Sequence, residues 1–195
     1  MKSDISEILK SKTVGIAGAG GLGSNCAVAL ARVGVGNLII ADFDIIDKSN
    51  LNRQYYFIHQ LGQKKVTALR TNINLINPDV NVKAVDIKLQ AKDITDIFSE
   101  CDVIVEAFDL AEMKHMIIET VLSEIPDMII VSGVGLAGWG NNNSITTRYS
   151  DNLIVCGDGK TETSEVLPPL APRVGIVANM QANQVLEILL NKANS

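Results

Sequence analysis

The chain has 195 residues, of which 47% are hydrophobic and 20% charged, and its formal net charge at pH 7 is −5. This composition is typical of a folded globular protein and excludes a disordered or collagen-like chain. The acidic balance and an aromatic content of only 4% argue against nucleic-acid binding, because phosphate backbones need clustered positive charge. We expect a single domain over residues 1–195, with neither nucleic acid nor membrane among its partners.

The three cysteines are Cys26, Cys101 and Cys156, and their wide spacing forms neither a disulfide framework nor a CxxC metal motif. Reduced thiols are typical of the cytoplasm, which is the location we expect. The first residues carry charges throughout and lack the apolar run of a secretory signal. The uncharged stretch at 128–147 is interrupted by glycines and asparagines, so we do not expect a membrane helix there.

Strand-like and helix-like segments alternate along the first two thirds of the chain. A short amphipathic segment at 4–10 precedes a buried strand at 13–18, a helix at 22–34 and a buried strand at 37–42. A helix at 63–76, stopped by Asn77 and Pro78, leads to an edge strand at 80–86. Buried strands at 102–108 and 127–132 then flank a helix at 111–123.

The remaining third departs from this alternation. Residues 144–149 and 152–156 predict a hairpin, a polar loop covers 157–172, and a helix at 174–190 follows. Alternating strands and helices predict a mostly parallel sheet with helices on both faces. The predicted fold is therefore an α/β, Rossmann-like doubly wound sheet with a C-terminal antiparallel hairpin and a final helix.

A glycine-rich loop follows the first strand directly and leads into a helix. Its sequence, GAGGLG, contains Gly18, Gly20, Gly21 and Gly23 and matches the GxGxxG phosphate-binding motif. Glycines permit close approach to a phosphate, and the helix N-terminus supplies unpaired N–H groups. Asp42 ends the second strand, where a carboxylate can accept both ribose hydroxyls. Although a glycine turn can serve packing alone, the three features together favour an adenine nucleotide site.

Three charged residues follow at positions that suit the phosphates. A triphosphate carries about four negative charges and needs cations beyond a helix dipole, which Arg53 and Lys65 could supply. Both could equally lie on a solvated surface. Asp109 follows the strand at 102–108 and could hold Mg²⁺ against phosphate oxygens, or instead cap the next helix. These residues alone leave both interpretations open.

Residues 18–54, with the patterns GVGxLxxxDxD and SNLNRQ, closely resemble the ThiF/MoeB/HesA family, relatives of ubiquitin-activating enzymes. The resemblance continues through 62–78, Asp109 and 168–189, and so covers nearly the whole chain. It is closest to the short, zinc-free ThiF of thiamine biosynthesis. Rossmann dehydrogenases do not carry SNLNRQ, so the resemblance argues against the distant alternative of an NAD-dependent oxidoreductase.

The resemblance implies an ATP-dependent adenylyltransferase. Such an enzyme adenylates the C-terminal glycine carboxylate of a small ubiquitin-like sulfur carrier, here ThiS-like, for thiamine thiazole biosynthesis, and releases pyrophosphate. The family also contains enzymes for other carriers and for a carboxylate on a modified tRNA nucleoside, and these remain alternatives. A homodimer is implied as well.

The resemblance also assigns roles to individual residues. Gly18, Gly20, Gly21 and Gly23 form the nucleotide loop and Asp42 holds the ribose. The other implied ligands face the phosphates and are Asn50, Arg53, Gln54 and Lys65. Asp109 is the implied magnesium ligand, and we expect Arg53, Lys65 and Asp109 to promote the reaction. Asp44 and Asp47 are expected on a solvated loop.

The chain departs from many relatives in ways that narrow the expected chemistry. Because the two zinc-binding CxxC pairs of relatives are missing, we expect no zinc. Ser164 falls near the position of a cysteine that relatives use, and the nearest thiol, Cys156, is expected to be a small buried residue. We therefore expect adenylation alone, with sulfur supplied by another protein.

Two further features stay open in the sequence. Relatives lend an arginine from the partner subunit's N-terminal segment, and the cations available here are Lys2, Lys10 and Lys12. Trp139, in a glycine-flanked turn, could cover the entry channel of the carrier tail or pack within the turn.

Overall fold

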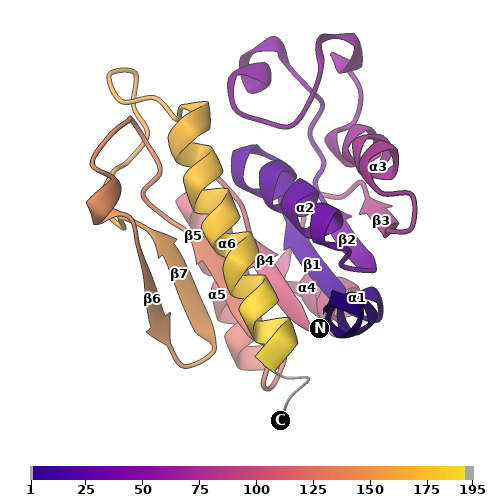
Figure 1. The fold of residues 1–195 in the computed structure, drawn as a ribbon. Coiled ribbons are helices and arrows are strands. Elements are labelled where there is room, and N and C mark those ends of the chain that lie inside the picture. The colour runs from indigo at the N-terminus through magenta and orange to yellow at the C-terminus, as the bar shows by residue number, and fades with distance from the viewer. Residues whose placement is uncertain (1, 192–195) are drawn as a thin grey trace.

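A computed structural model of the chain describes residues 2–191, with side chains from residue 5 onward. Its middle layer is a seven-stranded sheet in the order β3-β2-β1-β4-β5-β7-β6 (Figure 1). The strands are β1 (Thr13–Ala17), β2 (Asn37–Ala41), β3 (Asn81–Val85), β4 (Val103–Glu106), β5 (Ile130–Gly133), β6 (Thr146–Ser150) and β7 (Leu153–Gly157). Neighbouring strands pair in parallel except β6, which runs antiparallel to β7.

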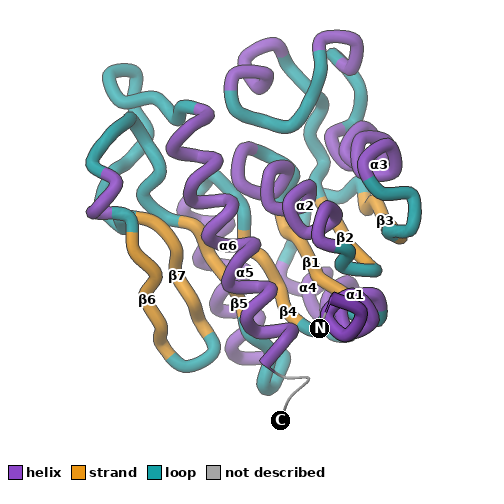
Figure 2. The backbone as a smooth tube through the Cα atoms, viewed as in Figure 1, coloured by secondary structure: helices purple, strands orange, loops and turns teal. Residues whose placement is uncertain are grey.

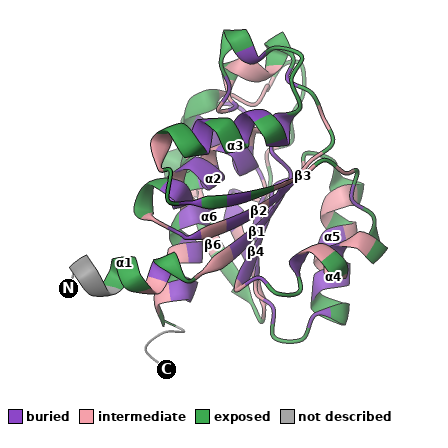
Figure 3. Ribbon diagram, turned by 90° about the vertical axis from the view of Figure 1, so that its right-hand side faces the viewer, coloured by how far each residue is buried: buried purple, intermediate pink, exposed green. Residues whose placement is uncertain are grey.

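Helices cover both faces of this sheet (Figures 1 and 3). They are α1 (Lys2–Lys10), α2 (Gly21–Val33), α3 (Lys65–Ile76), α4 (Ala91–Phe98), α5 (Ala111–Glu124) and α6 (Ala171–Asn191). The larger apolar core joins the sheet to α2, α3 and α6, and a second core joins it to α4 and α5. The Rossmann-like doubly wound fold, its C-terminal hairpin and its final helix are thus confirmed.

The order of the strands determines where a ligand can bind. From β1 the sheet continues through β2 to β3, and from β4 it continues in the opposite direction to β5. The direction therefore reverses between the adjacent strands β1 and β4. In open α/β sheets the carboxyl ends of the strands at such a switch point form a binding crevice. Long loops lie at this carboxyl edge (Figure 2).

The sequence prediction missed one helix and placed two boundaries three residues away, whereas the other boundaries agree within two residues. It named no element at α4, where Ile94 and Phe98 are fully buried against the sheet. An amphipathic pattern of only eight residues is too short to stand out from its surroundings. The strand β5 begins at Ile130 and α6 at Ala171, whereas expected starts were at 127 and 174. No helix within residues 2–191 is long and apolar enough to cross a membrane.

Candidate functional site

The glycine loop connects β1 to α2 at the switch point. Gly18 has a φ of 99°, and a Cβ on Gly23 would overlap the carbonyl oxygen of Gly18, so neither position accepts a larger residue without strain. The helix α2 begins at Gly21, and its N-cap Gly20 provides no side-chain hydrogen bond. The first N–H groups of α2 are thus available to an anion, as the GxGxxG motif predicts.

Asp42 lies against this loop immediately after β2. One carboxylate oxygen accepts a hydrogen bond from the Ala19 N–H at 2.6 Å, and the other accepts one from the Asp44 N–H at 2.8 Å. Burial raises the pKa of Asp42, and the Ala19 N–H and the charge of Lys65 oppose that rise. Each carboxylate oxygen keeps a second lone pair, so Asp42 can still accept ribose hydroxyls.

Lys65 begins α3 and is only 6% exposed. Its Nζ lies 2.7 Å from Oδ2 of Asp44, and its backbone N–H donates to the Asp44 carbonyl at 2.9 Å. Asp44, expected on a solvated loop, is half-exposed but holds this ammonium and also bonds to Asp42. Sequence reasoning missed that role. The signal was the spacing of Asp42 and Asp44, because residues two apart in an extended segment point to the same side.

Arg53 and Gln54 lie over the glycine loop at the end of a 3₁₀ turn, η1 (Lys48–Asn52). A Cβ built on Gly21 would lie 3.5 Å from Cγ of Arg53, and one on Gly20 would lie 3.8 Å from Nε2 of Gln54. Gln54 is buried, and its Oε1 has no hydrogen-bond partner within the described residues. Such an unpaired buried oxygen beside a phosphate loop is available to a ligand.

The guanidinium of Arg53 retains free donors. Its Nη1 donates to the Ser49 carbonyl at 3.1 Å and to Oδ1 of Asn52 at 2.8 Å. Both contacts use Nη1, so the other nitrogens of the guanidinium have no hydrogen bond inside residues 2–191. Asn50 differs from its neighbours, because its Oδ1 accepts the Asp47 N–H at 2.9 Å and so stabilises the start of η1. A contact of Asn50 with nucleotide stays a prediction.

Asp109 follows β4, on the other side of the switch point from the glycine loop. The N-cap of α5 is Leu110 and carries no side-chain hydrogen bond, so the interpretation of Asp109 as a helix cap is wrong. Asp109 is exposed, and no hydrogen bond or ion pair within the described residues engages its carboxylate. Within residues 2–191 no three acidic, His or Cys side chains gather to hold a metal. A single carboxylate completed by phosphate oxygens suits Mg²⁺, which prefers few protein ligands.

A buried charged cluster, missed in the sequence, lies beneath Asp109. Glu106 is 0% exposed and accepts hydrogen bonds from Lys114 Nζ at 2.9 Å, Ser132 Oγ at 2.5 Å and the Phe108 N–H at 2.7 Å. The last contact fixes the turn that carries Asp109. The sequence signal was a lone carboxylate in an otherwise apolar strand, because such groups are rarely buried without partners.

Cys156, Ser164 and Lys12 make contacts outside this constellation. Cys156 is fully buried, as expected, and burial raises its pKa to about 11. Ser164 is exposed, and its hydroxyl accepts the Leu167 N–H within a turn. Lys12 forms an ion pair of 3.1 Å with Asp102, at the opposite edge of the sheet. The side chain of Lys2 lies outside the described residues.

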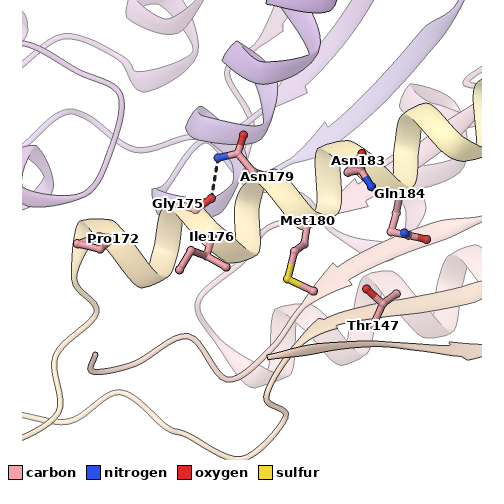
Figure 4. Close-up of a pocket in the computed structure, with 8 residues that line it drawn as sticks. All are labelled: Thr147, Pro172, Gly175, Ile176, Asn179, Met180, Asn183 and Gln184. Carbon is pink, nitrogen blue, oxygen red and sulfur yellow. Dashed lines mark hydrogen bonds between the residues drawn. The ribbon is translucent and has the colours of Figure 1, made fainter. Parts of the chain in front are cut away.

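A groove of about 680 Å³ lies elsewhere, between α6 and β6 (Figure 4). It contains none of the residues that the sequence assigned to nucleotide binding. It is lined by Thr147, Pro172, Gly175, Ile176, Asn179, Met180, Asn183 and Gln184. The hydroxyl of Tyr149 donates to Oε1 of Gln184 at 2.9 Å and joins β6 to α6 beside this groove.

Curated relatives are adenylyltransferases and modifier-activating enzymes by name. Molybdopterin-synthase adenylyltransferase of Haemophilus influenzae is 30% identical over 195 residues, with 96% of this chain and 78% of that protein covered. Adenylyltransferase and sulfurtransferase UBA4 of Vanderwaltozyma polyspora is 27% identical and covers 93% of this chain. Ubiquitin-like modifier-activating enzyme 5 of Caenorhabditis briggsae is 30% identical and covers 84%. The chain spans only 43% and 38% of the length of the last two.

Among solved structures, the fold is similar to that of Escherichia coli tRNA N6-threonylcarbamoyladenosine dehydratase, TcdA, in complex with AMP. The TM-score is 0.89 and the identity 17%, with 98% of this chain and 91% of that chain covered. At this identity the likeness shows a shared fold. The model of the ThiF family matches residues 2–195. The chain is therefore a member of the ThiF family, as its SNLNRQ segment and glycine loop predict.

Proposed function

We propose that the protein is an ATP-dependent adenylyltransferase that activates the C-terminal carboxylate of a small ubiquitin-fold sulfur carrier. The observation that carries this proposal is the convergence of the glycine loop, Arg53, Lys65 and Asp109 on one switch point. Membership of the ThiF family and relatives named as adenylyltransferases support it. A ThiS-like carrier, a role in thiamine biosynthesis and a homodimer rest on the sequence resemblance.

The chemistry explains why this site needs cations and no base. A carboxylate oxygen forms a bond to the α-phosphorus of ATP, while the bond to the bridging oxygen breaks and pyrophosphate leaves with the electron pair. The attacking carboxylate is already ionised at neutral pH, so no side chain has to remove a proton. Two anions must nevertheless meet, and preorganised positive groups lower the cost of that approach.

Several residues of the chain can supply these positive groups. The N–H groups of α2 and the free donors of Arg53 would bind the phosphates. The ammonium of Lys65 has three donors, and Asp44 uses one of them, so two remain for phosphate oxygens. Asp109 would hold Mg²⁺, which would neutralise charge on the phosphates as the two anions meet.

The surface beside the site favours a protein as the acceptor over RNA. The segment 158–170, which follows β7 at the same edge, exposes Glu162, Glu165 and Val166, and its exposed carboxylates outnumber its one exposed cation, Lys160. Carboxylates there repel an RNA backbone, whose binding requires cationic neighbours. The similarity of fold to TcdA supports the second candidate, a carboxylate on a modified tRNA nucleoside, which uses the same phosphate site.

ATP–pyrophosphate exchange separates these candidates. The purified protein is incubated with ATP, Mg²⁺, labelled pyrophosphate and either a panel of Gly-Gly-ended ubiquitin-fold carriers or tRNA bearing threonylcarbamoyladenosine. We expect exchange with a carrier, and loss of exchange when its two terminal glycines are removed. Exchange with the tRNA and with none of the carriers would refute the carrier proposal and support the second candidate.

A further inference from the structure

Two loops at the carboxyl edge are tied to each other on the side of the sheet formed by β5 and β7. The Gly138 N–H donates to the Pro168 carbonyl at 2.9 Å, which joins the loop after β5 to the segment after β7. Arg173 of α6 donates to the Gly140 carbonyl at 2.6 Å and to Asp158 at 2.6 Å. Because Arg173 and Asp158 are both buried, the two loops are held in one arrangement.

Trp139 projects from this fixed backbone. Its side chain is 70% exposed, whereas its neighbours Ala137 and Gly138 are buried. The φ angles of Gly138 and Gly140 are 77° and 66°, and the site of a Gly138 Cβ is filled by Leu167, so the turn depends on glycine. The interpretation of Trp139 as a packed residue is therefore wrong. A rigidly presented, exposed tryptophan is typical of a binding hot spot.

The direction of the nucleotide places Trp139 on the side of the acceptor. Asp42 follows β2, the glycine loop follows β1 and Asp109 follows β4, so a nucleotide bound to them runs from β2 toward β4. Lys65 pairs with Asp44 on the β2 side and Arg53 lies over the glycine loop, so pyrophosphate would leave toward these cations. A carboxylate attacking in line must then approach from the opposite side, over β4 and β5, and the loop that carries Trp139 follows β5. Strands are about 4.8 Å apart, so β5 lies about 10 Å from β1, which an extended peptide crosses in about three residues.

We propose that Trp139 determines acceptor specificity by holding an apolar side chain about three to four residues before the C-terminal carboxylate of a protein acceptor. This inference rests on the proposed function. The exposed Val166 beside Leu167 adds apolar surface to the same pair of loops. A tryptophan can also stack on a nucleobase, but in the adjoining segment Glu162 and Glu165 outnumber Lys160 and so disfavour an RNA backbone.

Steady-state exchange with a carrier that supports the reaction tests the inference. We expect Trp139→Ala to raise the KM for the carrier about tenfold, while kcat and the Kd for ATP stay within twofold. Trp139→Phe keeps an aromatic surface and should restore most of the affinity. Leu75→Ala is the matched control, because Leu75 is a large apolar residue that is 82% exposed near the carboxyl end of α3, ten residues beyond Lys65.

Intrinsic fluorescence gives a second readout that needs no substitution. Trp139 is the single tryptophan of the chain, so all tryptophan emission reports on this position. Titration with the same carrier, in a tryptophan-free form, should shift the emission to shorter wavelength and reduce its quenching by acrylamide. The carrier shortened by its last six residues should do neither.

The outcomes separate this inference from the function on which it rests. Exchange with an unchanged KM in Trp139→Ala would overturn the inference and leave the proposed function intact. Absence of exchange with every carrier would refute the proposed function and the inference with it. A changed oligomeric state with unchanged KM would assign Trp139 to a contact between copies, and a KM effect confined to tRNA would assign it to RNA; either result overturns the inference.

Discussion

Asp109 is the acidic residue at the switch point whose carboxylate no described residue engages, and we propose that it holds Mg²⁺ beside the phosphates of a nucleotide. We expect Asp109→Ala to lower carrier-dependent ATP–pyrophosphate exchange roughly 100-fold or more, because charge on the leaving group loses its counterion. Circular dichroism should be unchanged. Asp96→Ala is the matched control, because Asp96 is also exposed but lies on α4. Full activity of Asp109→Ala would remove Asp109 from the metal role.

Cys156 is the thiol nearest in sequence to the position where relatives carry a reactive cysteine, and it is buried. Burial raises its pKa from 9.0 to about 11, and only the thiolate is nucleophilic. We expect alkylation of native Cys156 by iodoacetamide to remain slow at pH 8 and to rise only as the pH approaches about 11. Cys156→Ser should retain exchange.

The raised pKa of Cys156 also makes the free energy of unfolding depend on pH. The unfolded thiol ionises near 9.0 and the folded one near 11, so the stabilising contribution of the buried Cys156 thiol is complete below pH 9.0 and is lost as the pH rises to about 11.

For the alkylation experiment, alkylation in urea provides the control, since all three cysteines should then react. Rapid modification of native protein at pH 7, or loss of exchange in folded Cys156→Ser, would contradict the expectation.

At the scale of elements, one arginine fastens the amino end of α6 to two loops. Arg173→Met would leave the buried Asp158 carboxylate without its counter-charge, and breaking such a pair costs about 3–5 kcal/mol. We expect a fall of that size in the free energy of unfolding in urea. Lys64→Met, which breaks the half-exposed pair with Asp86, should cost under about 1 kcal/mol. A similar loss of unfolding free energy in both variants would contradict the role of Arg173 in holding the two loops.

The dependence of the Arg173–Asp158 ion pair on pH follows from the titration of Asp158. Burial alone would raise the pKa of Asp158, but the N–H groups of Thr161 and Lys160, with Arg173, hold it below 3.8. A lowered pKa contributes stability that is complete above the unfolded value and is lost as the pH falls through the folded one. The Arg173–Asp158 ion pair therefore persists at neutral pH and weakens only in acid.

At the scale of the whole molecule, all three cysteines are buried, Cys26 and Cys156 in the larger core and Cys101 in the second. We expect the purified protein to contain no stoichiometric zinc by inductively coupled plasma mass spectrometry, because the chain lacks CxxC pairs that could form a tetrahedral thiolate site. Protein refolded with excess zinc and then desalted is the control. One zinc per chain in either sample would contradict the expectation.

Much of the fold could be predicted because its signals are local. Apolar runs bounded by glycine mark the parallel strands, and Gly34 ends α2 in a left-handed conformation, as its position after the periodic segment predicts. The helix α4 was missed because its few apolar positions become informative only when the sheet that they cover is known.

The sequence by itself determined the parallel sheet, the glycine loop and the family of this protein, because turns, periodicity and motifs depend on residues close together in the chain. Tertiary structure alone decided the pairing of Lys65 with Asp44, the burial of Glu106 and the exposure of Trp139. Each depends on partners from distant segments, such as Ser132 beneath Glu106 and Pro168 beside Gly138. Burial and charge pairing arise only when such segments meet, so a local pattern such as the lone carboxylate of Glu106 can indicate a buried charge but does not identify its partners.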